Sequence, residues 1–189
     1  MGIPGSWICG ILDVRFCFSM KWFDRKFNFD SLTGTFPSIL ERLAGTPLRL
    51  EDKLSNIPES YLTLRLDERW SIQENVGHLL DLEPLWLGRF EEFIAGVEIL
   101  READLTNAKT DQADHNAMAL SEILDGFRKQ REEMIRFIEP LSSKAEELSA
   151  LHPRLKQPMR LIDLSYFVAE HDDHHLARIT ALWNTLSGR

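Results

Sequence analysis

Two histidines on one predicted helix carry the clearest chemical signal in the sequence. His171 and His175 stand four residues apart within EHDDHH, residues 170–175. Side chains at positions i and i+4 of a helix lie on the same face, one turn apart. This spacing lets both imidazoles bind one metal ion. The apolar residues that share their face are Leu164, Val168, Ile179, Leu182 and Leu186.

The alternative to a metal is a pair of core histidines whose nitrogens are satisfied by hydrogen bonds or water. We favour the metal because two imidazoles at ligand spacing lie in the middle of an apolar face. His174 lies nearer the edge of that face. Two ligands alone make a labile site, so a third must come from another helix.

Three histidines are candidates for the third ligand. His115 and His152 fall in predicted connections, where we expect solvated side chains. His78 falls in the helix predicted over residues 71–97 but beyond the edge of its apolar stripe, and Pro84 predicts a kink or break there. Its direction therefore stays open on periodicity alone. A metal-bound histidine usually donates its other N–H to a carboxylate or carbonyl. The candidate carboxylates are Asp81, Glu170 and Asp172; alternatively, these three are ordinary surface carboxylates.

Other metal motifs fit less well. H-D-x-x-H resembles the H-E-x-x-H of zinc proteases, but the shorter Asp172 replaces the glutamate that acts as general base. A di-iron bundle needs Glu three residues before His, and the sequence has none. We assign no catalytic side chain. A three-histidine ion would keep an open position, which can activate a water or a thiol.

Composition restricts the class of protein. The chain has 189 residues, 22 Lys and Arg against 30 Asp and Glu, and a net charge of −8. No basic run suggests nucleic-acid binding, and no apolar stretch is long enough for a membrane span. Two cysteines, Cys9 and Cys17, make no disulfide framework, so we expect a cytoplasmic protein. With 28 Leu and only 4 Val, helices are favoured over strands.

The N-terminal residues differ from the rest. We interpret residues 1–19 as an atypical extension, upstream of a natural start at Met20, and residues 20–189 as a single domain. The aromatic stretch over residues 22–29 should pack on the protein's own core or on a partner in a homodimer.

Four segments have helical periodicity and should position the histidines. They predict an all-α fold, a four-helix bundle with long crossover connections whose helix order stays open. Ser71 and Glu74 form a capping box, and Pro47 indicates a late start or a kink. Alternating leucines over residues 62–66 indicate a short extended piece. The four helical segments are residues 36–54, 71–97, 117–138 and 161–186.

WSIQENVGHLLDLE at residues 70–83, with HDDHHLARI at residues 171–179, resembles the DinB/YfiT superfamily. The resemblance implies a divalent metal, zinc or nickel, held by His78, His171 and His175. It also implies a small-molecule substrate and a low-molecular-weight thiol as partner, because characterised relatives include thiol S-transferases and a thiol-dependent isomerase. The alternative functions are a metal-dependent hydrolase and a non-catalytic, metal-stabilised binding module. The protein could also form a homodimer.

Overall fold

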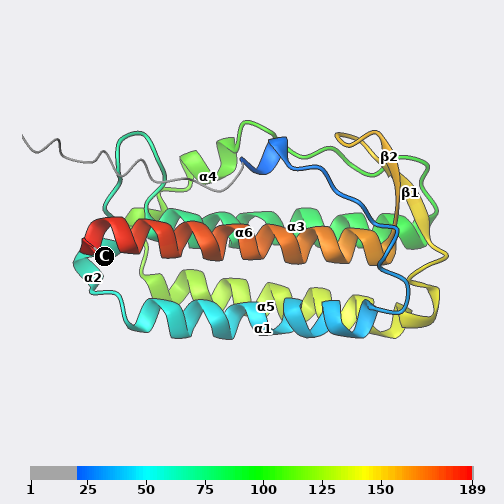
Figure 1. Ribbon diagram of the computed structural model, residues 1–189, viewed down its shortest axis with the longest axis horizontal. Coiled ribbons are helices and arrows are strands. Elements are labelled where there is room, and N and C mark those ends of the chain that lie inside the picture. Colours follow the sequence, from blue (N-terminus) through cyan, green and yellow to red (C-terminus); the bar gives the residue numbers. More distant parts are fainter. Residues whose placement is uncertain (1–20, 189) are drawn as a thin grey trace, which may run out of the picture.

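A four-helix bundle forms the body of the protein. The computed structural model describes residues 21–188, so the proposed extension over residues 1–19 lies outside the described residues and the domain division stays a prediction. The bundle consists of α1 (Phe36–Ser55), α3 (Ile72–Ala95), α5 (Leu120–Ile138) and α6 (Leu161–Ser187) (Figure 1). The predicted fold class is confirmed, and the four predicted ranges differ from these helices by three residues or fewer at each end.

The helices follow an unusual order around the bundle. α1 and α3 each pack against both α5 and α6, which places α1 opposite α3 and α5 opposite α6. In Figure 1, α1 and α6 start at the end that carries the strands, whereas α3 and α5 start at the other end. α3 and α5 are therefore parallel, and the connection over residues 96–119 must run back along the bundle. It carries α4 (Ala108–Gln112) and the 3-10 helix η2 (His115–Ala117).

Short elements close the ends of the bundle. The residues between α5 and α6, expected to be a plain connection, contain η3 (Glu139–Lys144) and the antiparallel hairpin β1 (Ser149–His152) and β2 (Gln157–Arg160). The hairpin is joined to the crossover, because the Leu100 amide donates to the Leu151 carbonyl at 3.0 Å. The remaining elements are η1 (Trp22–Asp24) and α2 (Glu59–Leu62).

The predicted extended piece over residues 62–66 is wrong. Leu62 is the last residue of α2 and is buried, whereas Leu64 is 45% exposed. No strand among the described residues pairs with this segment, so its alternation has no sheet to stabilise it.

Neither proline breaks its helix, so the late start expected at Pro47 and the division expected at Pro84 are wrong, whereas a kink stays a prediction. α1 runs through Pro47 and α3 runs through Pro84. A proline at position 47 has no N–H to offer the carbonyl of Leu43. Arg131 of α5 takes this place, since its Nη1 donates to the Leu43 carbonyl at 3.1 Å. The proline thus leaves an acceptor that a buried arginine uses.

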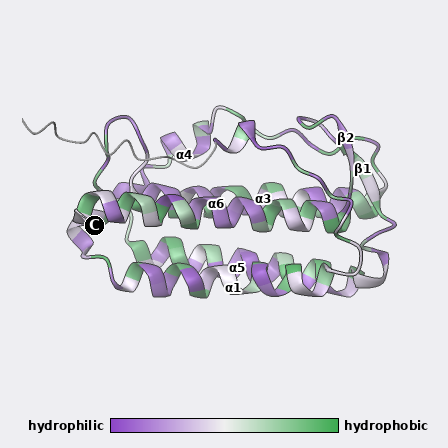
Figure 2. Ribbon diagram, in the orientation of Figure 1, coloured by the Kyte–Doolittle hydropathy of each residue, from purple (hydrophilic) through white to green (hydrophobic). Residues whose placement is uncertain are grey.

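A polar layer divides the apolar core in two. One cluster includes Leu43, Phe90 and Met134, and the other includes Leu50, Leu79 and Phe127. Figure 2 shows hydrophobic and hydrophilic residues mixed along each of the long helices, as expected for helices that bury one face. Buried polar side chains from all four helices make up this layer, among them Thr46, His78, Glu83, Arg131 and Asp172.

Within residues 21–188, no helix combines the length and apolar composition that a membrane span requires.

Candidate metal centre

Three buried histidines converge in the polar layer. His78 from α3 and His171 and His175 from α6 each offer a ring nitrogen, and these nitrogens lie within 4.8 Å of one another. The ring centroids are 4.6–5.4 Å apart. Each residue is 3–4% exposed. The structure therefore brings together the three residues that the resemblance implied, and it resolves the direction of His78.

The ring of His175 is oriented by an amide on α3. Its Nδ1 lies 3.0 Å from Oδ1 of Asn75, while the Asn75 side-chain nitrogen donates to the Ser71 carbonyl at 2.7 Å. Because an amide oxygen only accepts, Nδ1 of His175 must donate. The lone pair of the neutral ring is then on Nε2.

His78 is oriented by a chain of hydrogen bonds from the crossover. Its Nδ1 lies 2.9 Å from Oγ1 of Thr110, and that hydroxyl donates to Oδ2 of Asp81 at 2.9 Å. The hydroxyl has one proton, which goes to the carboxylate, so the threonine oxygen accepts from the Nδ1–H of His78. His78 also presents Nε2. Of the predicted supporting carboxylates, Asp81 thus acts on a cluster histidine, through Thr110.

The expectation that His115 is solvated is wrong. It is 3% exposed, and its Nε2 lies 2.8 Å from Oδ2 of Asp81. Gly77 makes room for it, because a Cβ at this position would lie 2.2 Å from the imidazole carbon Cγ. A glycine one residue before His78 therefore lets the crossover come close enough to deliver Thr110.

The expectation for His152 is also wrong. It ends β1, is 2% exposed, and packs against Phe167 with ring centroids 5.4 Å apart. It is not part of the three-histidine cluster among the described residues. Neither histidine could be placed from the sequence, because both lie in connections whose paths depend on tertiary contacts.

Burial keeps the cluster histidines neutral. Desolvation, opposed by the negative charge of Asp81 and assisted by the positive charge of Arg178, lowers the pKa of His78 to about 4. Desolvation also lowers the pKa of His171 and His175 well below the ordinary value, with the neighbouring histidines adding to the effect. Neutral imidazole is the form that binds metal.

His171 shows that the cluster fits a metal ion. Its Nδ1 is buried and has no hydrogen-bond partner among the described residues. An unsatisfied buried nitrogen costs free energy that a ligand can recover. Three neutral imidazoles, two with Nε2 free, are also the donor set of open zinc sites.

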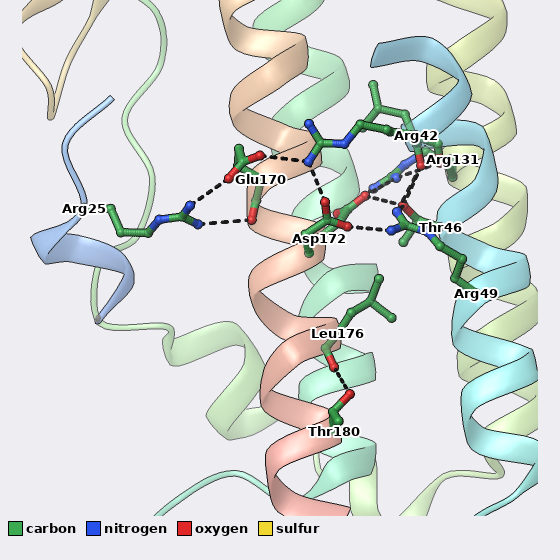
Figure 3. Close-up of polar contacts among 11 residues, drawn as sticks. Arg25, Arg42, Thr46, Arg49, Arg131, Glu170, Asp172, Leu176 and Thr180 are labelled. Carbon is green, nitrogen blue, oxygen red and sulfur yellow. Dashed lines mark hydrogen bonds and ion pairs between the residues drawn. The ribbon is translucent and has the colours of Figure 1, made fainter. Parts of the chain in front are cut away.

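The other two predicted supporting carboxylates serve a different purpose. Glu170 pairs with Arg25 at 2.7 Å and Arg42 at 2.8 Å, and Asp172 pairs with Arg131 at 2.5 Å (Figure 3). Figure 3 shows that Arg42 and Thr46 reach from α1 to these carboxylates on α6. Glu170 and Asp172 therefore fix the position of α6 without contacting the imidazoles.

Tryptophans and a cavity enclose the cluster. Trp22 and Trp86 approach His171 with ring centroids 5.0 and 5.7 Å apart, and Trp70 approaches His78 at 4.7 Å. The aromatic N-terminal stretch thus packs on the protein's own α6. A cavity of about 260 Å³ opens beside the three histidines and has these tryptophans in its wall.

The fold and the cluster define a class: a four-helix bundle with three buried histidines from two helices that fit one metal ion. A family model of the DinB superfamily matches residues 42–179, and the chain belongs to this superfamily. The resemblance seen in the sequence is confirmed.

One solved structure extends the comparison. The chain is similar to YfiT from Bacillus subtilis, described as a probable metal-dependent hydrolase with an unusual four-helix bundle topology. The TM-score is 0.74 at 20% identity, covering 86% of this chain and 94% of YfiT. The similarity supports the fold and its helix order. No curated protein sequence matches the chain.

The Thr110 hydrogen bonds lead to a first prediction. Thr110→Val removes both the acceptor for His78 and the donor to Asp81, so metal affinity should fall about 10–100-fold. Thr110→Ser keeps the hydroxyl and should keep the affinity. Competition titration with a chromogenic chelator measures the change. Thr180→Val, on α6, is the matched control, because its hydroxyl bonds the Leu176 carbonyl. Equal affinity for Thr110→Val and Thr180→Val would contradict the assigned role.

Proposed function

We propose that the protein is a metal-dependent enzyme in which His78, His171 and His175 hold one divalent cation, zinc or nickel. The observation that carries the proposal is the convergence of three buried neutral imidazoles beside a cavity. A purely structural site is normally closed by four protein ligands, whereas three ligands leave a position for substrate. The described residues provide no fourth His, Cys, Asp or Glu within the cluster.

The residues around the three histidines have different roles. A bound cation would supply Lewis acidity, which lowers the pKa of a thiol or water and polarises an electrophile. Asn75 and Thr110 hold the imidazoles of His175 and His78 with Nε2 available. Trp22, Trp70 and Trp86 pack against the imidazoles of His78 and His171 and shield them from water.

We propose that the reaction transfers a low-molecular-weight thiol to an electrophile. A thiol has a pKa of about 8.5, so it needs less assistance from a base than water does. The carboxylates on the helices beside the histidines are already engaged: Asp81 by Thr110 and His115, Glu170 and Asp172 by arginines. This arrangement supports a reaction that does not rely on a carboxylate base.

Hydrolysis is the second candidate, favoured by the description of YfiT as a probable metal-dependent hydrolase. The test compares zinc- and nickel-loaded full-length protein with the chelated form. One panel pairs small thiols with a chlorodinitrobenzene electrophile, and the other contains activated esters and amides. Metal-dependent thioether formation is expected. Turnover only of esters or amides would support hydrolysis instead.

A protein inert toward both panels would point to a non-catalytic, metal-stabilised module. Chelation then discriminates. A structural metal lowers the melting temperature greatly when removed, whereas a catalytic metal can leave a folded apo-protein. Elemental analysis of the purified protein, with anomalous scattering at the cluster, shows whether and which metal is bound.

A further inference from the structure

The cavity beside the histidines is lined by three arginines from separate elements. Arg89 comes from α3, Arg154 from the turn between β1 and β2, and Arg178 from α6. Among residues 21–188, none of the three forms an ion pair with a carboxylate. Other arginines of the bundle do, such as Arg42, Arg49 and Arg131. The chain has a net charge of −8, so this local excess of positive charge runs against the overall charge.

Several nitrogens in the cavity wall have no partner. Four buried side-chain nitrogens among the described residues make no hydrogen bond, and three of them belong to cavity residues. These are Nη2 of Arg154, Nε of Arg178 and Nδ1 of His171. The first two are donors on guanidinium groups, which match the oxygens of carboxylates and phosphates.

Arg89 is held as a fixed positive charge. It is 1% exposed, and its Nε and Nη2 donate to the Arg101 carbonyl at 3.1 and 2.9 Å. Its Nη1 lies 3.3 Å from Nε2 of His152, whose Nδ1 also faces two backbone amides at 3.2 Å. A neutral imidazole has one lone pair, so His152 cannot accept hydrogen bonds at both Nδ1 and Nε2. It therefore cannot satisfy the guanidinium of Arg89 and the two backbone amides together.

The electrostatics of the three arginines favour binding of an anion. Burial, opposed by the negative charge of Glu92 and assisted by repulsion from Arg154 and Arg101, lowers the pKa of Arg89 to about 10. Desolvation also lowers the pKa of Arg154 and of Arg178. An anion bound beside partly buried positive charges stabilises their charged forms, which burial disfavours.

The carboxylates in the cavity lining do not fill this role. Glu102 is exposed and forms no ion pair with the three arginines. Asp104 accepts from the amides of Thr106 and Ala108 at 2.9 and 2.8 Å, and from the Thr106 hydroxyl at 2.6 Å. Its oxygens are thus used to shape the crossover.

The rest of the lining is apolar. Trp22, Trp86 and Phe167 face the cavity together with Leu82 and Leu85. The guanidinium of Arg154 lies over the rings of Phe23 and Phe167, 5.4 and 5.9 Å from their centroids. A ligand that fits this wall has an aromatic or aliphatic body in addition to its charge.

We propose that the cavity binds an organic anion, whose carboxylate or phosphate contacts Arg154 and Arg178 and whose apolar body packs on Trp22, Trp86 and Phe167. Arg89 contributes its charge from the wall. The inference deepens the proposed function, because it names the substrate class of the same site. That the anion is a substrate rests on the proposed function. Binding itself requires no metal.

Calorimetric titration of the full-length protein tests the inference. The probes are phenylacetate and phenyl phosphate, with neutral phenylacetamide as the uncharged analogue. The anions should bind at least about tenfold more tightly than the amide, because charge-assisted hydrogen bonds are lost with the charge. Binding should weaken with salt. At least one of Arg154→Met and Arg178→Met should weaken anion binding about tenfold, and the corresponding lysine variant should recover part of it.

Arg136→Met is the matched control, because Arg136 is an exposed arginine on α5 outside the cavity. It should bind the anions like the unaltered protein. The titration is repeated on chelated protein, where the anions should still bind. Anion binding by a protein that retains no metal after loading with zinc or nickel would reject the proposed metal centre and keep this inference. Equal binding of anion and amide, or unchanged anion binding in both arginine variants, would overturn the inference alone.

Discussion

Arg131→Met is expected to lower the free energy of unfolding by about 3–5 kcal/mol. Arg131 is 1% exposed and pairs with Glu83 at 2.6 Å and Asp172 at 2.5 Å, both of which are buried. It joins α5 to carboxylates on α3 and α6 and to the Leu43 carbonyl on α1. Methionine would leave two carboxylates without their cation in the polar layer. Urea unfolding followed by circular dichroism measures the loss.

A surface pair on the same helix provides the control. Arg128 pairs with Glu51 of α1, and both side chains are more than a third exposed. Arg128→Met should cost less than about 1 kcal/mol, because exposed ion pairs contribute little. A triple variant that combines Arg131→Met with Glu83→Leu and Asp172→Leu leaves no buried carboxylate unpaired at these positions. It should recover much of the lost free energy of unfolding. If Arg131→Met costs no more than Arg128→Met, the network does not stabilise the bundle as described.

The cost of Arg131→Met should also depend on pH. Burial raises the pKa of Glu83, and the charge of Arg131 opposes this rise. Without the arginine, the folded state should hold the proton of Glu83 more tightly than the unfolded chain does. A carboxyl whose pKa is raised on folding destabilises as the pH rises above its unfolded value, about 4.3. The penalty should therefore be larger at pH 7 than at pH 5.

The buried network and the metal centre depend on the same stretch of α6. Asp172 follows His171 directly, so the arginine that holds Asp172 also fixes the helix that carries the histidines. Thr46 adds a second anchor from α1, since its hydroxyl lies 2.9 Å from Oδ2 of Asp172. EHDDHH thus serves two purposes: its acids attach the helix to its neighbours, and its first and last histidines face the cluster.

The sequence predicted the bundle and the three histidines for different reasons. Helical periodicity was strong enough to give each long helix, because every helix buries one apolar face. The spacing of His171 and His175 follows from helix geometry alone. His78 was placed by resemblance to the family, since it lies beyond the apolar stripe of its helix.

Residues that act through tertiary contacts gave no signal in the sequence. Thr110 reaches His78 only because the crossover runs back along the bundle. Asn75 and Arg131 lie on predicted helices, yet an amide or a guanidinium there is usually solvated. The β1–β2 hairpin carries two prolines, and its Leu151 forms a bridge with Ile99 of the crossover. The partners of these residues and of the hairpin are far away in the sequence, so no local sequence pattern identifies the contacts.

His175→Ala should nearly abolish metal binding. The binding free energy of structural zinc is about 10–16 kcal/mol, which is roughly 3 kcal/mol for each of four ligands. Losing one of only three protein ligands should therefore lower metal affinity on the order of a hundredfold or more. The same result is expected for His78→Ala and His171→Ala. Elemental analysis after dialysis, and competition with a chromogenic chelator, measure the loss.

His174→Ala is the control that makes this result specific. His174 is next to His175 on α6, is also buried at 8% exposure, and lines the same cavity. It lies outside the group of nitrogens that converge. Both variants remove one buried imidazole, so a general loss of packing should affect them alike. Metal retained by His174→Ala and lost by His175→Ala would support coordination by the three-histidine cluster. Equal metal content in the two variants would contradict coordination of the ion by His175.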